Sequence, residues 1–276
     1  MAFFFELDDA RPEVRKGVAS TAITHYARVD GEGLVAASSV SGECKYTIYD
    51  SNGDTLQAST NITPSADPDG VNSKFTFSVP AIAELQEDAY IVVEWQKSGD
   101  SERRVNTIYF DVVLQPWGAS SVAINDLLAV RPDAGQVLDQ QAARIGGGLT
   151  RESLASIYGS RAHTELYHWI RSQISAESAG RADGAATITR PRLILDKTAI
   201  HRVETILAVA LVYEGDMTST EATESDAAAL FAHYSERAKD SFRALGPLRY
   251  DATEDRVVDT IKPSFGRAVR MRRLQG

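Results

Sequence analysis

The spacing of apolar residues changes near residue 117 of this chain. Before that point apolar side chains recur at every second position, and after it they recur at every third or fourth. A strand turns successive side chains to opposite faces, whereas a helix brings positions three and four apart onto one face. The sequence therefore predicts an α+β protein of two domains, with strands over residues 1–117 and helices over residues 118–247.

Several short segments of the first part carry strand signals. The segments 45–49 and 55–58 flank Asn52-Gly53, a pair that tolerates positive φ at the centre of a turn, so we expect a hairpin there. Alternating apolar positions mark three further strands, with faces formed by Phe75, Phe77 and Val79, by Ile91, Val93 and Trp95, and by Ile108, Phe110, Val112 and Leu114. Repeated period-2 segments predict an immunoglobulin-like β-sandwich, although the cysteine pair of antibody domains is absent.

The second part reads as a helical bundle. We expect a short helix over 122–130 and another capped by Asp133. A long helix should follow the cap Thr150, a second should begin with Pro191 in its first turn, and a third should begin near 218–220. The expected buried stripes include Val137, Leu138, Ala142 and Ile145 on the second short helix, and Leu154, Ile157, Tyr158, Ala162, Leu166, Trp169, Ile170 and Ile174 on the first long one.

Composition narrows the class of protein. The 276 residues contain no apolar run long enough to span a bilayer, and the first residues lack the positive start of a secretory signal. Cys44 is the single cysteine, which suits a reducing compartment, so we expect a soluble intracellular protein with no membrane association. The net charge of −9 disfavours wrapping around nucleic acid.

The end of the chain has the opposite charge. Residues 248–276 are expected to form an extended C-terminal arm. Its last fifteen residues, 262–276, contain no acidic side chain and five basic ones: Lys262, Arg267, Arg270, Arg272 and Arg273. Two interpretations stay open, a solvated terminus and an arm that pairs with an acidic partner.

No motif predicts catalysis. His163 and His168 are five positions apart and so face different sides of a helix, while His201 and His233 lie on different helices that could bring them together. Glu165 and His168 fit the Glu-x-x-His pattern of di-iron bundles once, where two copies are needed. We therefore expect no enzyme activity, no metal and no cofactor.

Taken together, several segments resemble the head–tail connector, or adaptor, proteins of tailed bacteriophages. The resemblance covers residues 118–276 and rests on loose patterns: Asp126-Leu127-Leu128, Arg131-Pro132-Asp133, Trp169, the helix from Ile200 to Tyr213, Tyr234 with Phe242 and Leu245, and the closing Leu248-Arg249-Tyr250-Asp251 before the basic tail. The first part, with Tyr90 to Trp95 and Tyr109 to Val113, is similar to β-sandwiches added to other virion proteins. The simplest connectors lack such a part.

The resemblance implies a structural protein of the virion neck, assembled in the host cytoplasm. Copies of the chain, typically twelve, would form a ring beneath the portal protein and above a tail or neck completion protein. Genomic DNA would pass through the ring without sequence-specific binding, and the arm with Lys262 to Arg273 would dock on the portal.

An alternative is a binding module of the virion. The sandwich would then recognise a glycan or a surface protein through exposed aromatic residues such as Tyr46, Tyr49 or Tyr90, and the helices would form a stalk. Core packing is the competing interpretation of those aromatic residues.

Overall fold

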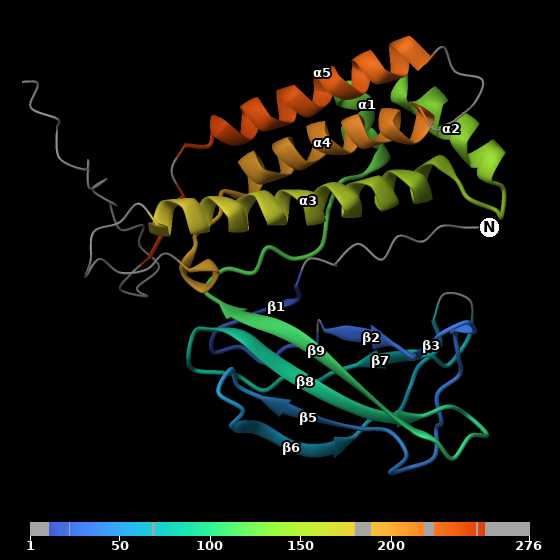
Figure 1. Ribbon diagram of the computed structural model, residues 1–276, viewed down its shortest axis with the longest axis vertical. Helices are drawn as coiled ribbons and strands as arrows, with labels where there is room; N and C mark the ends of the chain where they lie inside the picture. Colours follow the sequence, from blue (N-terminus) through green and yellow to red (C-terminus); the bar gives the residue numbers. More distant parts are fainter. Residues whose placement is uncertain are drawn as a thin grey trace, which may run out of the picture.

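A computed structural model describes residues 11–21, 23–67, 70–179, 189–217, 224–246 and 248–251. Strands occupy the first part and helices the second, so the α+β prediction is confirmed (Figure 1). The strands are β1 (Glu13–Arg15), β2 (Thr24–Tyr26), β3 (Arg28–Val29), β4 (Gly33–Leu34), β5 (Lys45–Tyr49), β6 (Thr55–Asn61), β7 (Lys74–Thr76), β8 (Gln86–Gln96) and β9 (Arg103–Val113). The helices are α1 (Ile124–Val130), α2 (Ala134–Ile145), α3 (Arg151–Ala179), the 3-10 turn η1 (Arg190–Arg192), α4 (Lys197–Met217) and α5 (Glu224–Arg243).

The strands form one main sheet with a smaller pair against it. The five-stranded sheet has the order β1-β9-β8-β5-β6, in which β1 runs parallel to β9 and all other neighbours are antiparallel. The pair β2–β7 covers one face of this sheet, where Phe75 of β7 packs against Trp95 of β8 with 6.3 Å between ring centroids. Every second residue of β8, from Ala89 to Trp95, is buried in the shared core, as the alternation predicts.

The hairpin between β5 and β6 is confirmed, but its turn differs from the expected one. Gly53 has a φ of 90°, whereas Asn52 does not adopt positive φ. The Asp50 carbonyl accepts a hydrogen bond from Gly53 N–H, and Asp50 Oδ1 accepts from the N–H groups of Asn52 and Asp54, each at 2.8 Å. An Asx turn on Asp50 therefore organises this longer loop, and only its glycine needs the left-handed conformation.

The opposite face of the main sheet carries a row of tyrosines. Tyr49, Tyr90 and Tyr109 lie side by side on β5, β8 and β9 in register. The rings of Tyr49 and Tyr90 stack with centroids 5.0 Å apart, and Tyr109 is 50% exposed. Tyr46, by contrast, is buried on the core face, so core packing is the correct interpretation of that residue.

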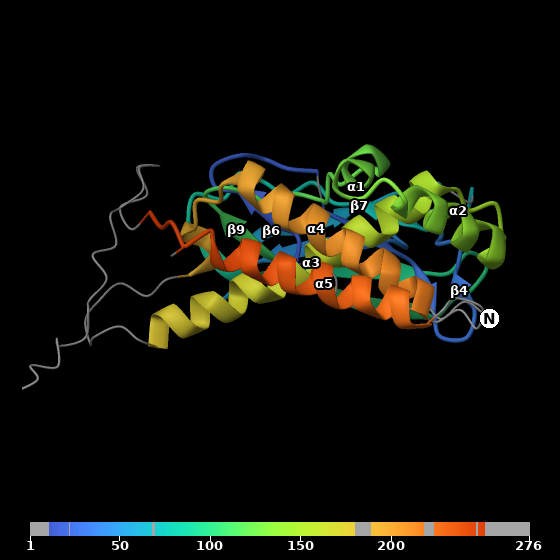
Figure 2. The same cartoon turned by 90° about the horizontal axis from the view of Figure 1, so that it is seen from above.

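The long helices form a layer above the sheet (Figures 1 and 2). Helix α3 lies between the sheet and the pair α4–α5, and the short helices α1 and α2 lie beside α4. Helix α4 is buried over most of its length, from Val203 to Tyr213, because neighbours cover it on several sides. The predicted cap at Thr150 is confirmed by a hydrogen bond from Ser153 N–H to Thr150 Oγ1.

Three details of the helical prediction are wrong. Pro191 lies in η1, and α4 begins later, at Lys197, where Asp196 Oδ1 accepts the N–H groups of Thr198 and Ala199. Ile145 and Ile157 are 58% and 46% exposed rather than buried. Helical spacing alone placed them on the buried stripes, but no described element covers that side of α2 or of the first turns of α3.

A buried glutamine ties three helices together. Gln141 of α2 accepts a hydrogen bond from the Tyr158 hydroxyl of α3 at 2.9 Å and donates one to the Val212 carbonyl of α4 at 2.8 Å. Gly215 of α4 makes room for this arrangement, because a Cβ there would collide with the Tyr158 hydroxyl. Close approach to the tyrosine therefore requires glycine at position 215.

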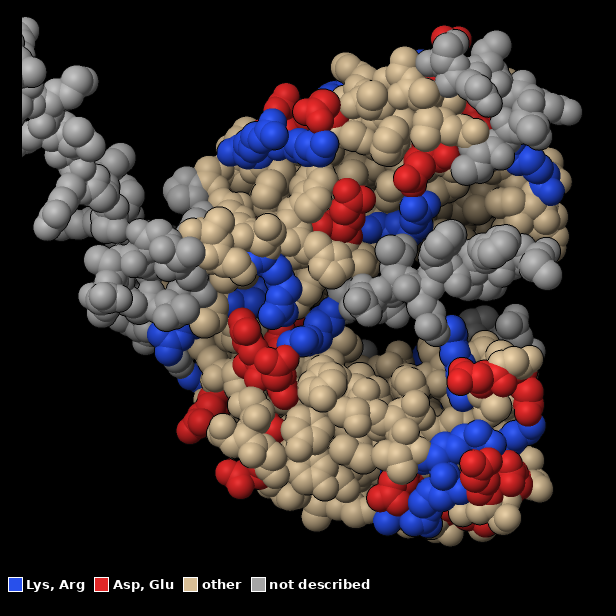
Figure 3. Space-filling view, in the orientation of Figure 1, with Lys and Arg blue, Asp and Glu red and all other residues tan. Residues whose placement is uncertain are grey.

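Two groups of charges flank the sheet on the face shown in Figure 3, and further charged side chains lie over the helices. One is the end of the sheet at the β8–β9 turn, where Arg103 and Arg104 pair with Glu94, Asp100 and Glu102. The other is the junction between the sheet and the helices, with a largely uncharged surface between them.

Candidate functional site

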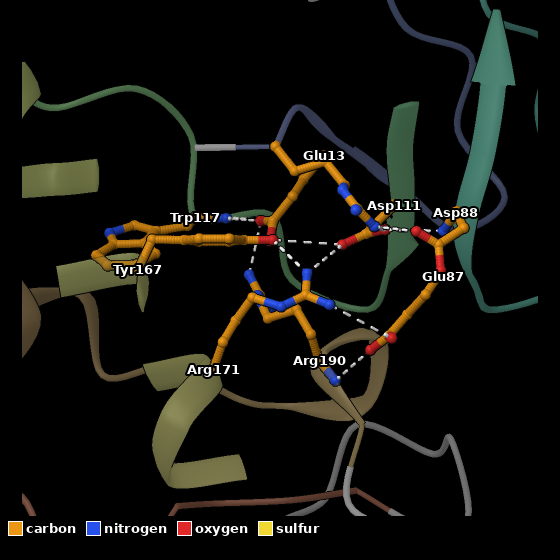
Figure 4. A network of polar contacts seen from close by, with 9 residues as sticks. Glu13, Glu87, Asp88, Asp111, Trp117, Tyr167, Arg171 and Arg190 are labelled. Atoms are coloured by element: carbon orange, nitrogen blue, oxygen red, sulfur yellow. Dashed lines mark hydrogen bonds and ion pairs between the residues drawn. The ribbon is translucent and has the colours of Figure 1, made fainter. Parts of the chain in front are cut away.

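The junction between the sheet and the helices contains a network of ionised side chains (Figure 4). It forms where β9 ends, because the helical part covers the sheet face that is exposed further along the strand. Phe110, Asp111, Val112 and Val113 are consequently all buried, on both faces of the strand. We call the following set the junction network: Arg11, Glu13, Glu87, Asp88, Asp111, Tyr167, Arg171 and Arg190.

Asp111 is the centre of the junction network. Its side chain is fully buried, and its Oδ1 accepts the Asp88 N–H at 3.1 Å and Arg11 Nη1 at 3.3 Å. Its Oδ2 accepts the Tyr167 hydroxyl at 3.4 Å and lies 3.6 Å from Arg171 Nη1. A buried carboxylate is expensive unless it is paired, and these contacts from β8, the N-terminal segment and α3 supply its partners.

Glu13 and Arg190 form the second buried pair. Arg190 Nη2 donates to Glu13 Oε2 at 2.6 Å, and the two side chains are 1% and 4% exposed, respectively. The same Glu13 oxygen accepts the Trp117 N–H at 2.7 Å, so this carboxylate also holds the chain where the strands give way to helices. Arg190 Nη2 donates in addition to the Gln115 carbonyl at 3.2 Å.

A bulge in β8 directs a third carboxylate into the network. The β8–β9 register shifts between Gln86 and Ala89, and Asp88 has a φ of 64°, a left-handed conformation that aspartate tolerates better than most residues. Glu87 is thereby turned toward the helices, where its Oε1 accepts the Arg190 backbone N–H at 3.0 Å and its Oε2 lies 3.7 Å from Arg171. Asp88 forms an ion pair with Arg11.

Burial shapes the protonation of these groups. Burial raises the pKa of Glu13 and outweighs the opposing effects of Arg190 and of the Trp117 hydrogen bond. Burial also raises the pKa of the Tyr167 hydroxyl, with Asp111 adding to the shift. For Arg171, burial alone would lower the pKa, but Tyr167 and the carboxylates of Asp111 and Glu87 leave it raised. Arg171 therefore keeps its charge, and Glu13 is a carboxyl group of this network whose proton uptake burial favours.

A cavity of about 230 Å³ adjoins the network. Trp117, Ile23 and Tyr167 form its walls together with Glu13 and His163. The His163 ring lies 4.2 Å from the Trp117 ring, and its Nδ1 is 3.5 Å from Glu204 Oε1, with both side chains more than nine-tenths buried. Neither of these two atoms makes a hydrogen bond in the structure. The histidine thus joins α3 to α4 beside the wall formed by Trp117.

The junction network is suited to fixing the sheet on the helical layer. Its arginines and carboxylates come from β1 and the residues just before it, and from β8, β9, α3 and η1, and each is in contact with another member of the network. Glu13 Oε1 and the Nε and Nη1 atoms of Arg190 are buried there without a hydrogen bond. Backbone contacts continue the connection, since Leu114 N–H donates to the Pro191 carbonyl at 2.8 Å and Gln115 makes two hydrogen bonds with Leu195. Among the described residues no group of three or more His, Cys, Asp and Glu side chains could hold a metal ion.

The structure separates the histidines singled out in the sequence. His163 is buried and His168 is exposed, as their spacing predicts. His201 contacts Ser121 at 3.2 Å and lies 3.7 Å from Asp126, whereas His233 packs against Tyr234, so these two have different partners.

Five residues were predicted to dock on a partner, and all of them lie outside the described residues: Lys262, Arg267, Arg270, Arg272 and Arg273.

Sequence reasoning missed the junction network entirely. One local signal was available, because Asp111 interrupts the apolar run from Ile108 to Leu114 at a position facing away from the sheet core. A carboxylate placed there indicates either an exposed face or a buried partner. The sequence offers no way to identify that partner as Tyr167 and Arg171, more than fifty positions away.

Within the described ranges, no helix combines the length and the apolar character that crossing a membrane requires. Comparisons with family models, with curated proteins and with solved structures find no match to this chain in any of the three.

Proposed function

We propose that this chain is a head–tail connector of a tailed bacteriophage, a structural protein of the virion neck without enzyme activity. In this proposal residues 1–117 are an immunoglobulin-like β-sandwich and residues 118–247 a helical connector domain. Copies of the helical domain form the ring beneath the portal through which the genome passes, and residues 248–276 form an arm that reaches the portal.

The observation that carries the proposal is the buried junction network. Glu13, Asp111 and Arg190 have almost no exposure, so they are not accessible to a substrate and serve to fix the sheet on the helices. A fixed relation between two parts is what a subunit of a closed ring needs, since a variable angle would prevent identical contacts around the ring. We identify that ring as the head–tail connector because residues 118–276 resemble connector proteins.

Imaging of the intact particle that contains this chain tests the proposal. We expect a closed ring of identical subunits in contact with a larger ring above it. A chain displayed outward as a spike, or absent from the neck, would contradict the connector function.

The tyrosine row favours a second candidate, a glycan-binding module. Tyr49, Tyr90 and Tyr109 form an aromatic strip on the face of the main sheet opposite the shared core. Aromatic side chains at exposed positions are typical of binding surfaces. Screening of the full chain and of a Tyr109→Ala variant on an array of neutral oligosaccharides tests this candidate, which requires binding that the substitution weakens.

A further inference from the structure

We infer that the cavity beside the junction network receives the phenylalanine triplet Phe3-Phe4-Phe5 of its own chain. The cavity has a volume of about 230 Å³ and lies between the beginning of the sheet, which contributes Glu13, and α3, which contributes Tyr167. The inference concerns a contact within one copy, so it holds or fails independently of the proposed ring.

Most of the cavity lining is apolar. Pro12, Ile23 and Ala119 contribute aliphatic groups, and the rings of Trp117 and Tyr167, with centroids 6.1 Å apart, contribute an aromatic wall. Aromatic rings pack favourably on one another at centroid distances of about 4.5–7 Å. An apolar cavity of about 150 Å³ already holds a benzene ring, so this larger one has room for a phenyl side chain.

A buried oxygen in the lining favours a peptide over a purely apolar ligand. The Glu13 side chain is 4% exposed and its Oε1 makes no hydrogen bond, whereas its Oε2 accepts from Arg190 and from the Trp117 N–H. A buried polar atom without a hydrogen bond costs free energy. A peptide brings backbone N–H groups together with its side chains, and one of them can donate to Glu13 Oε1.

The chain enters the described part of the fold at this cavity. Arg11 and Pro12 are the first described residues, and both belong to the lining. The sequence before them supplies the matching chemistry, because its apolar triplet ends at Phe5. Residues 6–10 separate the triplet from Arg11, and a connection of that length is common where a chain reverses direction.

The short connection favours the triplet of the same copy over that of a second copy. A segment joined to its site through few residues is present there at an effective concentration in the millimolar range. The triplet of another copy competes only when the protein concentration approaches that value. The gain is the removal of apolar surface from water, and burial of a single phenyl ring already stabilises the folded state.

Fluorine NMR of two full-length variants tests the inference. Labelling with 5-fluorotryptophan gives three resonances, since the chain has three tryptophans, and the substitution Trp117→Phe identifies the one from the cavity wall. The triplet variant carries Phe3→Ser, Phe4→Ser and Phe5→Ser. The matched control changes the same segment without touching a phenyl ring and carries Glu6→Gln, Asp8→Asn and Asp9→Asn.

The triplet variant should shift the Trp117 resonance, because a phenyl ring leaves the cavity wall. The resonances of Trp95 and Trp169 are internal references and should stay in place, since Trp95 lies in the sheet core and Trp169 packs against Phe242. The control variant should leave all three resonances in place. Circular dichroism verifies that each variant is folded.

A labelled peptide of residues 1–10 measures the contact directly. We expect the triplet variant to bind it and the wild-type chain to bind it about 100-fold more weakly, because the wild-type cavity is already occupied by a tethered competitor. Bound peptide should also return the Trp117 resonance of the triplet variant toward its wild-type position. A peptide with serine in place of the three phenylalanines is the control and should not bind.

A nitroxide on Ala2→Cys gives a second measurement that leaves the triplet intact. Cys44 is buried, so the label attaches at position 2 of the native chain. The label should broaden the Trp117 resonance more than those of the other two tryptophans. Equal broadening of all three would mean that the triplet does not stay at the cavity.

Three results would overturn the inference: a Trp117 resonance that the triplet variant does not shift, an equal shift in the control variant, or absent peptide binding. A wild-type dimer in sedimentation velocity that the triplet variant loses would show exchange of the triplet between copies, and it would overturn the assignment to the same copy. Images of the particle test the ring alone, so failure of the connector function is distinguishable from failure of this contact.

Discussion

Arg190 follows Glu13 by 177 positions in the chain, and its guanidinium donates a hydrogen bond of 2.6 Å to the Glu13 carboxylate, with both side chains almost fully buried. Glu13 belongs to the first strand of the main sheet and Arg190 to the turn that precedes α4. One hydrogen bond thus connects the beginning of the sheet to the helical layer, and its energetics can be measured.

We expect Arg190→Met to destabilise the protein by about 3–5 kcal/mol, because it leaves the Glu13 carboxylate buried without its charged partner. Urea denaturation followed by circular dichroism measures the free energy of unfolding. Arg243→Met is the matched control, since Arg243 pairs with Asp240 on the exposed surface of α5 and its loss should leave stability unchanged. Equal unfolding curves for the two variants would contradict a structural role for the junction network.

Glu13 should give an unusual pH dependence. Burial raises its pKa in the folded protein above the ordinary value of 4.5, so the folded state binds this proton more tightly than the unfolded state. The stability that Glu13 contributes is then fully present below pH 4.5 and is lost as the pH rises through the folded-state pKa. We expect the difference in unfolding free energy between wild type and Glu13→Gln to decline over that rise. A difference that grows with pH would mean that the attraction of Arg190 exceeds the effect of burial.

Gly215→Ala should destabilise the helical layer by about 1–3 kcal/mol through overpacking, in spite of the better helix propensity of alanine. The new methyl group would displace the Tyr158 hydroxyl from Gln141. Tyr158→Phe removes the colliding atom, so in a double-mutant cycle the two substitutions together should cost less than the sum of their separate costs. Thermal unfolding of the four proteins measures this coupling, and strict additivity would show that the methyl group is accommodated elsewhere.

Cys44 should react slowly with thiol reagents in the native protein. It is 1% exposed, burial raises the pKa of its thiol, and the sulfur donates to the Ser38 carbonyl at 3.3 Å. Only the thiolate reacts, and burial disfavours it. We expect the reaction with Ellman's reagent at pH 8 to be slow in buffer and fast in 6 M guanidinium chloride, where it serves as the control. Rapid reaction in buffer would indicate that the edge of the sheet near Cys44 opens readily.

The order of strands and helices could be predicted from the sequence because each element carries its own periodicity. The faces of Phe75, Ile91 and Trp95 follow from alternation alone, and the cap at Thr150 follows from the preference of its side chain. The elements that depend on distant partners could not be predicted. Strand β1 is three residues long and exists because β9 lies beside it, and Ile157 is exposed because no described helix reaches it.

The junction network is beyond sequence reasoning for the same reason. Asp111 interrupts an apolar run, but nothing near it in the sequence identifies its partners, and only the fold reveals that Asp111, Tyr167 and Arg171 meet. Burial there depends on how the helical layer lies across the end of β9, which no local pattern encodes.

The distance along the chain between Glu13 and Arg190 also sets an order of events during synthesis. A ribosome that has released residues 1–117 has supplied every strand, so the sheet can fold while Arg190 is still to be made. Until then the carboxylates of Glu13 and Asp111 face water, which solvates them at no cost. They become buried only when α3 and η1 have been made, so the junction closes after the strands are complete and while α4 and α5 are still to follow.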